Sequence, residues 1–415
     1  MSAEAFLGDF HHVATIGATP NNGVDRQAAT EDDRRTRDWF RAFAAERGWE
    51  TRVDGIGNLF ALLTWRAGAK YVLIGSHLDS QPLGGRFDGA YGVIAALHAA
   101  ERIATRVAAG SAPPEFNLAV VNWFNEEGGR FPPSIMGSSV YAGIKNHDEM
   151  LHVRDLSGTT VAEALQAIGY LGRDEPPSPA GYAEIHIEQG RILEREGSTI
   201  GAVDSSWYTQ KLDIEVLGEQ SHTGATAMAD RRDALVAAAR IVLMVQDVTN
   251  DFEPEVLVSS VGQLTLEPNS PIVVPRRVHL VADLRANSPE VVKAARATLL
   301  TQIEDVARQH NMTINVQDFD IRENQYYPGA GVELTEKVAA DLGMEARRMQ
   351  TMAGHDSVAM NRIVPSVMVF IPSVGGVSHC EREFSRDEDM TAGVDVLTGI
   401  TWELLTGALQ EKNHT

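Results

Sequence analysis

Residues 71–77 spell Tyr71-Val72-Leu73-Ile74-Gly75-Ser76-His77, a continuous apolar run that ends in small and then polar residues. Such a run is typical of a strand buried on both faces of a sheet. A Gly-rich turn follows, and then an apolar helical pattern that begins at 93–97 and continues towards Ile103. Residues 117–124 predict a second buried strand. This alternation predicts an α/β domain with a mostly parallel sheet, whose ligands bind beyond the carboxyl ends of the strands.

A different pattern occupies residues 207–325. It predicts strands and helices at 211–216, 232–246, 256–266, 278–284, 289–307 and 313–319, in the order β-α-β-β-α-β. This is the order of the ferredoxin-like split unit. The buried-type strand Ser366–Ile371 and a helix after Asp389 then resume the first domain. We therefore expect one domain from residues 1–206 and 326–415, and an inserted α+β domain from residues 207–325.

Charge and composition exclude several classes of protein. The chain has 36 Lys and Arg against 57 Asp and Glu, a net charge of −21, which argues against a broad nucleic-acid surface. The single cysteine, Cys380, excludes an intrachain disulfide framework and a cysteine-based zinc cluster. No apolar run reaches the roughly 18–20 residues that a membrane span needs. The first residues lack the basic region and apolar core of a secretory signal, so we expect a cytoplasmic protein.

Imidazoles and carboxylates gather where the predicted strands end. These residues are His77, Asp79, Asp88, Glu126, Glu127, His186 and His379. Because the carboxyl ends of parallel strands meet at one edge of the sheet, we expect these side chains to converge. Each histidine alone is better explained as an ordinary core or surface residue, but together they have the chemistry of a site for zinc or a similar ion. Crowded carboxylates would repel one another unless cations neutralised them.

An ordered set of motifs extends over about residues 40–400. It comprises Gly75–Ser80, Gly84–Gly89, Asn125–Gly128, His186–Gly190, His222–Thr226, Pro268–Ser270, Asp283–Arg285, Gly354–Asp356 and Ser378-His379 with Glu383. The set resembles the zinc-dependent amidohydrolases of the M20 metallopeptidase superfamily, in particular the hydantoinase/carbamoylase branch. That branch contains N-carbamoyl-L-amino-acid hydrolases, β-ureidopropionases of the bacterial type and allantoate amidohydrolases. The resemblance implies a metallopeptidase-like catalytic domain and an inserted domain through which two copies of the chain form a homodimer.

The resemblance also implies a dinuclear metal site with five ligands. His77 and His186 would hold one divalent ion, Glu127 and His379 the other, and Asp88 would bridge them. Zinc is the first choice of ion, and manganese, cobalt and nickel are the other candidates. Two ions that share one carboxylate can activate a water and polarise a scissile carbonyl.

Two further carboxylates are assigned to this site. Glu126, beside the ligand Glu127, would be the general base that takes a proton from the attacking water and passes it to the leaving nitrogen. The alternative is that Glu126 is a surface carboxylate that merely adjoins a ligand. Asp79 lies two residues beyond His77 on the same extended segment, so we expect it to accept the other ring N–H of that ligand.

Four residues would bind the substrate. Gln189 would bind its polar head, and His222, Asn269 and Arg285 match positions that contact substrate in the family. Arg285 offers a fork suited to an α-carboxylate, unless it pairs with Asp283 and only stabilises the insertion. His222 would reach the active site of the partner subunit and stabilise the oxyanion, unless it is a turn histidine that caps the following helix.

The chain departs from the family pattern at three places. Trp207 and Tyr208 stand where small residues are usual, Ala227 replaces a proline, and Cys380-Glu381 occupies positions of which the second is commonly proline. Two large aromatic side chains at a hinge beside the site would reshape the pocket. The metal ligands are intact, so the departures concern the identity of the substrate.

We expect the chain to hydrolyse a linear amide or ureido C–N bond, in the first place that of an N-carbamoyl-L-amino acid, to amino acid, ammonia and carbon dioxide. Allantoate and N-acyl amino acids or dipeptides are the alternative substrates. Relatives that act on N-acyl amino acids or dipeptides commonly carry a carboxylate where this chain has His186. A non-catalytic metal-binding scaffold would have lost Glu126 or a ligand, and neither is missing.

Overall fold

The chain divides into two compact units, Met1–Ser205 with Tyr326–Thr415, and Ser206–Gln325. The computed structural model describes residues 2–410. The inserted unit opens at Ser206, where the sequence pattern suggested residue 207.

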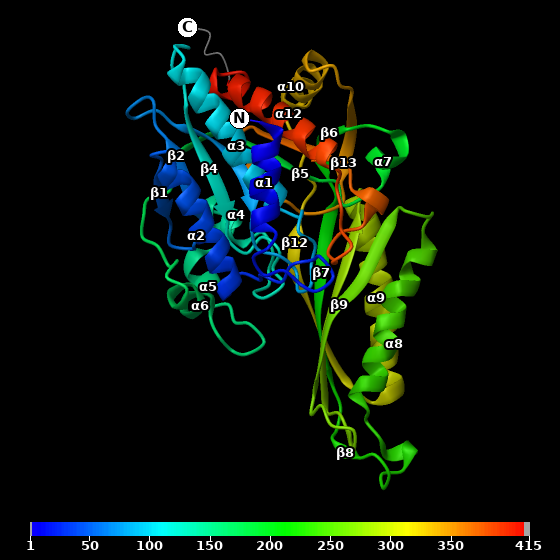
Figure 1. Cartoon of the computed structure of the whole chain (residues 1–415). Helices are drawn as coiled ribbons and strands as arrows, with labels where there is room; N and C mark the ends of the chain where they lie inside the picture. Colours follow the sequence, from blue (N-terminus) through cyan, green and yellow to red (C-terminus); the bar gives the residue numbers. More distant parts are fainter. Residues whose placement is uncertain (1, 411–415) are drawn as a thin grey trace. The chain divides into compact units, whose positions relative to one another are not determined.

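An eight-stranded sheet forms the centre of the first unit, in the order β1-β2-β4-β3-β5-β14-β6-β13 (Figure 1). Its strands are β1 (Glu50–Val53), β2 (Leu59–Leu63), β3 (Tyr71–His77), β4 (Asn117–Trp123), β5 (Pro179–Ile187), β6 (Ile200–Ser206), β13 (Ala346–Thr351) and β14 (Ser366–Ile371). The four central strands β4, β3, β5 and β14 run parallel, whereas β1 and β2 pair antiparallel with their neighbours and β6 pairs antiparallel with β14. The prediction of a largely parallel central sheet is confirmed.

The pleat of the parallel strands sends alternate side chains to opposite faces of the sheet. In β4, Leu118 and Val120 join the large core that includes α3 and α12, whereas Val121 and Trp123 pack on the other face. The α-helices of this unit are α1 (Ala3–Val13), α2 (Glu31–Glu46), α3 (Ala90–Ala108), α4 (Met136–Tyr141), α5 (His147–Leu151), α6 (Val161–Ala167), α7 (Ile192–Glu196), α10 (Gly329–Asp341), α11 (Asp356–Met360) and α12 (Asp387–Leu405). Helix α3 is apolar nearly all round because it lies between the sheet and helices α1 and α12.

The inserted unit has a four-stranded antiparallel sheet in the order β12-β7-β11-β9. Its elements are β7 (Tyr208–Leu217), β8 (Ser221–His222), α8 (Ala234–Asp247), β9 (Leu257–Glu267), β10 (Val273–Val274), β11 (Arg277–Ala286), α9 (Pro289–His310) and β12 (Thr313–Arg322). Apolar side chains of α8 and α9 pack on one face of this sheet and form a separate core. The predicted β-α-β-β-α-β order is confirmed, and β8 pairs with β10 as a short arm beyond the sheet (Figure 1).

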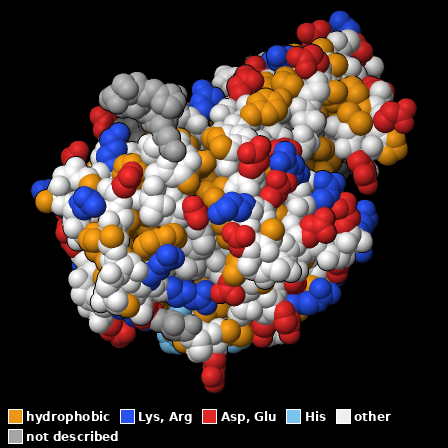
Figure 2. Space-filling view, turned by 90° about the horizontal axis from the view of Figure 1, so that it is seen from above, with side chains coloured by type: hydrophobic (Ala, Val, Ile, Leu, Met, Phe, Trp, Pro, Cys, Tyr) orange, Lys and Arg blue, Asp and Glu red, His pale blue; other side chains and the backbone are white. Residues whose placement is uncertain are grey.

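The surface of the molecule carries both signs of charge. On the face drawn in Figure 2, acidic and basic side chains are interspersed among small apolar patches. Among residues 2–410, no helix has both the length and the apolar character needed to cross a bilayer.

Candidate metal centre

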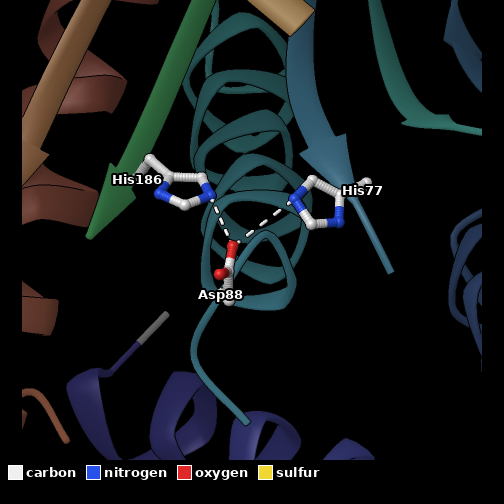
Figure 3. Close-up of side chains that lie close together, drawn as sticks. All are labelled: His77, Asp88 and His186. Atoms are coloured by element: carbon white, nitrogen blue, oxygen red, sulfur yellow. Dashed lines mark ion pairs between the residues drawn. The ribbon is translucent and has the colours of Figure 1, made fainter. Parts of the chain in front are cut away.

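The predicted ligands meet at the carboxyl ends of the parallel strands of the first unit. They form two groups that share Asp88, one with His77 and His186 and the other with Glu127 and His379. Within each group, one ligand atom from each residue lies within 4.8 Å of the others. Figure 3 shows the first group, in which Oδ1 of Asp88 lies 3.0 Å from Nε2 of His186 and 3.6 Å from Nε2 of His77.

The second group uses the other oxygen of the same carboxylate. Nε2 of His379 lies 3.3 Å from Oδ2 of Asp88 and 3.4 Å from Oε2 of Glu127. The carboxylate of Asp88 therefore faces three imidazoles at once. Burial by itself would raise the pKa of Asp88, but hydrogen bonds from His186, His379 and His77 outweigh it and hold that pKa well below its usual value.

Strand ends and tight turns position these side chains. His77 is the last residue of β3, and His186 is the penultimate residue of β5. Asp88 stands just before α3, where a side chain at Gly89 would collide with the ring of His77, since a Cβ there would lie 2.3 Å from it. Three non-glycine residues around the site have left-handed backbones, with φ of 52° at Asn125, 60° at Gln189 and 55° at His379. Such strained conformations are common at functional sites.

Backbone carbonyls orient the two buried imidazoles. Nδ1 of His77 lies 2.9 Å from the carbonyl oxygen of Asp79, and Nδ1 of His186 lies 2.9 Å from that of Ile187. A carbonyl accepts only, so each Nδ1 carries a proton, and each Nε2 is the ring atom that faces Asp88 and would bind a metal ion once its own proton is lost. This is the orientation that a metal ion requires of an imidazole ligand.

The expected contact of the Asp79 carboxylate with His77 is wrong in its detail. The carboxylate oxygen stands 3.7 Å from Nδ1 of His77, and it is the backbone carbonyl of Asp79 that holds the ring. Its two side-chain oxygens instead accept the backbone N–H groups of Glu126 and Glu127, each at 3.3 Å. The alternation of side-chain direction fails because β3 ends at His77, so Asp79 is no longer on a strand.

Glu126 is buried at the site, which contradicts the alternative that it is a surface carboxylate. Its Oε2 lies 3.5 Å from Nε2 of His77. Burial raises the pKa of Glu126 well above its usual value, and the neighbouring His77 offsets only part of this. The carboxylate is thus close to the ligand groups and in surroundings that favour its holding a proton.

Two residues support the site in roles that the sequence did not predict, although Glu383 belongs to the motif set. Oε1 of Glu383 accepts the backbone N–H groups of Phe87 and Asp88, each at 3.0 Å, and fills the space that a side chain at Gly85 would need. Gln81 donates from its side chain to Oε2 of Glu127 at 2.9 Å. In the sequence, Gly85 lies close to Asp88, and Glu383 lies close to His379. This closeness does not predict that Gly85 and Glu383 contact each other.

Gln189 lies beside the carboxylate of Asp88, which the two groups share. Its side-chain nitrogen donates to Oδ2 of Asp88 at 2.7 Å and to the hydroxyl of Ser378 at 3.2 Å. Because a carboxylate can only accept, the contact with Asp88 fixes which end of the amide is the nitrogen. The amide oxygen of Gln189 is then buried without a hydrogen-bond partner among the described residues.

The remaining predicted substrate residues lie in the inserted unit. His222 pairs with Val273 in the β8–β10 arm, and the exposed Asn269 lies in the loop that leads to β10. Nδ1 of His222 accepts the backbone N–H groups of Gly224 and Ala225 at 2.9 and 3.0 Å, so the turn contact of the alternative explanation is present.

Arg285 stands on β11 opposite Thr209. Its guanidinium makes the ion pair with Asp283 that the alternative explanation described, with an Nη2–Oδ2 distance of 2.7 Å. Tyr208 also differs from expectation: it is buried in the core of the inserted unit, because β7 already begins there and turns this ring to its inner face.

Comparison with known proteins gives the family. The model of Peptidase family M20/M25/M40 matches residues 73–403. The N-carbamoyl-L-amino-acid amidohydrolase of Rhizobium meliloti is 34% identical over 96% of this chain and 95% of its own. The allantoate amidohydrolase of Bacillus subtilis is 30% identical over 94% of this chain and 95% of its own.

Solved structures agree with these relatives. The crystal structure of an amidase of the hydantoinase/carbamoylase family from Burkholderia vietnamiensis matches with a TM-score of 0.93 and 34% identity, over 97% of each chain. The resemblance found in the sequence motifs is confirmed, and the chain belongs to Peptidase family M20/M25/M40.

Proposed function

We propose that the protein is a metal-dependent amidohydrolase that cleaves the ureido C–N bond of an N-carbamoyl-L-amino acid to amino acid, ammonia and carbon dioxide. The observation that carries the proposal is the buried carboxylate of Glu126 beside two ligand groups that share Asp88. A shared carboxylate flanked by imidazoles and a second carboxylate is the donor set of a two-metal hydrolytic site.

The donor chemistry fits two divalent ions. His77, His186 and Asp88 would hold one, and Asp88, Glu127 and His379 the other. Imidazole and carboxylate ligands suit zinc, which is our first choice, and also manganese, cobalt and nickel. When bound, the ions would polarise the scissile carbonyl and lower the pKa of a water at the site.

The residues of the chain would move the proton. Glu126 would take a proton from the attacking water and deliver it to the nitrogen that leaves as one C–N bond breaks. The carbamate that remains would then lose carbon dioxide and free the second nitrogen. Asp79 would hold the turn that carries Glu126 and Glu127, since its two oxygens accept their backbone N–H groups. Burial raises the pKa of Glu126, and nearby cations would oppose that rise, so the carboxylate could both accept a proton and release it.

Gln189 supports a ureido substrate over an N-acyl one. Its amide oxygen is a buried acceptor without a partner among the described residues, next to the bridging Asp88. Leaving such an acceptor unpaired costs free energy, so a ligand with an N–H group is favoured there. The terminal NH2 of a ureido group supplies that donor, whereas the methyl group of an N-acetyl substrate does not.

Two substrate residues of the inserted unit are too far apart to serve one site in one chain. Arg285 pairs with Thr209, whereas Arg277 pairs with Leu217 at the end of β7 nearest the arm that carries His222. The eight residue steps from Arg277 to Arg285 span roughly 27 Å of strand. If both residues contact one substrate, they come from different copies of the chain, which supports a homodimer with shared active sites.

The hydrogen bonds of His222 favour the tautomer that could donate to an oxyanion. Because its Nδ1 accepts two backbone N–H groups, the neutral ring carries its proton on Nε2. That N–H would donate to the oxygen of the tetrahedral intermediate in the partner subunit. The turn contact and the catalytic role are therefore compatible, since they use different ring nitrogens.

The inserted unit also has apolar surface for a second copy. Strand β9 is an edge of its sheet and exposes Val258 and Leu264, and the adjacent α8 exposes Leu243. Met228 and Ile272, near the arm, are 77% and 67% exposed. An open edge strand with apolar neighbours favours association with a second chain.

The test is an activity screen of protein loaded with Zn²⁺, Mn²⁺, Co²⁺ or Ni²⁺, on N-carbamoyl, N-formyl and N-acetyl forms of one amino acid and on allantoate. We expect turnover of the N-carbamoyl compound and little of the N-acetyl compound. If the protein prefers allantoate, allantoate becomes the proposed substrate. Allantoate also has ureido N–H groups that could donate to the amide oxygen of Gln189. Absence of divalent metal and of activation by all four ions would overturn the proposal.

A further inference from the structure

The loop that carries His379 lacks the usual means of holding a metal ligand. The imidazole is 50% exposed, so packing does not fix it. The backbone φ of 55° lies in the left-handed region, which is unfavourable for a residue with a side chain. The ligand therefore depends on contacts made by its neighbours in the loop.

One neighbour anchors the loop on the side of the bridging carboxylate. The hydroxyl of Ser378 donates to Oε2 of Glu383 at 2.7 Å. The other oxygen of Glu383 accepts the backbone N–H of Asp88 at 3.0 Å. These contacts belong to the site already described.

A second anchor connects the loop to a turn near the N-terminus. The carboxylate of Glu381 accepts a hydrogen bond from the hydroxyl of Thr19 and another, at 2.8 Å, from the side-chain nitrogen of Asn21. Thr19 is itself held, since its backbone N–H donates to the carbonyl oxygen of Gly23 at 2.9 Å. The turn at residues 18–24 lies outside residues 73–403, which the family model matches.

The same turn contacts the loop that leads to Asp88. The backbones of Val24 and Gly84 exchange two hydrogen bonds, of 3.0 and 2.9 Å. Gly23 lies between the two loops so closely that a Cβ there would stand 2.5 Å from the carbonyl oxygen of Gly84 and 2.6 Å from Cγ of Glu381. The turn thus touches the loops of two predicted ligands, Asp88 and His379.

We propose that Glu381 is a positioning residue for the metal centre: tied to Thr19 and Asn21, it keeps His379 within reach of Asp88 and Glu127. The inference rests on the proposed metal pair. Glu381 stands where a proline is common in the family, and proline would restrict the loop through its fixed φ. In this chain, the loop is restricted instead by the hydrogen bonds of the Glu381 side chain to Thr19 and Asn21.

The test measures the two Zn²⁺ affinities of the full-length protein by competition with a chelator. The variant His379→Ala first identifies which binding step belongs to its ligand group. We expect Glu381→Ala to weaken that step by about tenfold, in the range of residues that orient metal ligands, and the other step by less than about twofold. Glu381→Gln keeps an oxygen that can accept, so its loss should be smaller.

Two further sets of variants separate anchoring from general damage. Thr19→Val with Asn21→Ala should reproduce the loss of Glu381→Ala, and adding Glu381→Ala to that pair should weaken binding no further. Arg382→Ala, at the adjacent exposed position, is the matched control and should leave both steps unchanged.

Three outcomes decide against the inference in different ways. If the unaltered protein binds fewer than two ions, the proposed metal pair itself fails. If it binds two ions and Glu381→Ala binds them equally well, Glu381 does not position His379. If Glu381→Ala weakens both steps alike and lowers the Tm of the metal-free protein, its contacts support the fold in general.

Discussion

Oε2 of Glu126 lies 3.5 Å from Nε2 of His77, the same ring nitrogen that faces the carboxylate of Asp88. A buried carboxylate therefore lies next to the predicted ligands without being one of the five residues that form the two groups. Its burial raises its pKa, so the carboxylate is suited to holding a proton for part of a reaction cycle.

This geometry predicts a separation of catalysis from metal binding. Glu126→Gln keeps the shape of the side chain and removes its ability to accept a proton, so kcat should fall by roughly 10²–10⁴-fold. Elemental analysis should find the same metal content as in the unaltered protein. A variant that kept near-normal turnover would show that another group is the base.

The affinity of the second ligand group should depend on pH. The negative charge of Glu127 raises the pKa of His379 to about 10 in the metal-free protein. At pH 7 the ring therefore holds a proton that a cation must displace, so affinity should rise with pH until that pKa is approached. Calorimetry in two buffers of different ionisation enthalpy measures the protons released. His379→Ala should release about one fewer, and equal release from both proteins would contradict the assignment.

Arg285 should discriminate between substrates with and without a carboxylate. Arg285→Ala should lower kcat/KM by roughly ten- to a hundredfold on the N-carbamoyl amino acid, because charge-assisted bonds to its carboxylate are lost. The loss should be much smaller on the amide analogue. Arg277→Ala is the matched control, since it removes an ion-paired arginine from the other end of the same strand.

The ion pair between Arg285 and Asp283 suggests a different outcome for the Arg285→Ala variant. If Arg285 serves only to pair with Asp283, the variant should lose thermal stability and lose activity equally on both substrates. Measurement of kcat/KM and Tm for both arginine variants distinguishes these outcomes.

Mixing two inactive variants tests whether His222 acts across a dimer. A mixed dimer of Glu126→Gln and His222→Ala would contain one site with both residues intact. Random exchange makes half of the dimers mixed, so activity should recover to about a quarter of the unaltered level. Recovery should be absent if His222 serves the site of its own chain, because neither variant would then contain an intact site.

Residue types at strand ends were enough to predict which imidazoles and carboxylates meet at one edge of the sheet. The run Tyr71–His77 and the strand Ser366–Ile371 follow from the apolar pattern, and parallel strands bring their carboxyl ends to one edge. The motifs around His77, Asp88 and His186 then indicate a metal site, because few other arrangements collect imidazoles and carboxylates in this way.

Only the tertiary structure decided how the loops between these strands are held. The carboxylate of Asp79 serves the turn of Glu126 rather than the ring of His77, because β3 ends before it. The contact of Glu381 with Thr19 joins positions 362 residues apart in the sequence. Side-chain periodicity predicts helices and strands, but it does not predict which loops, distant in the sequence, contact each other.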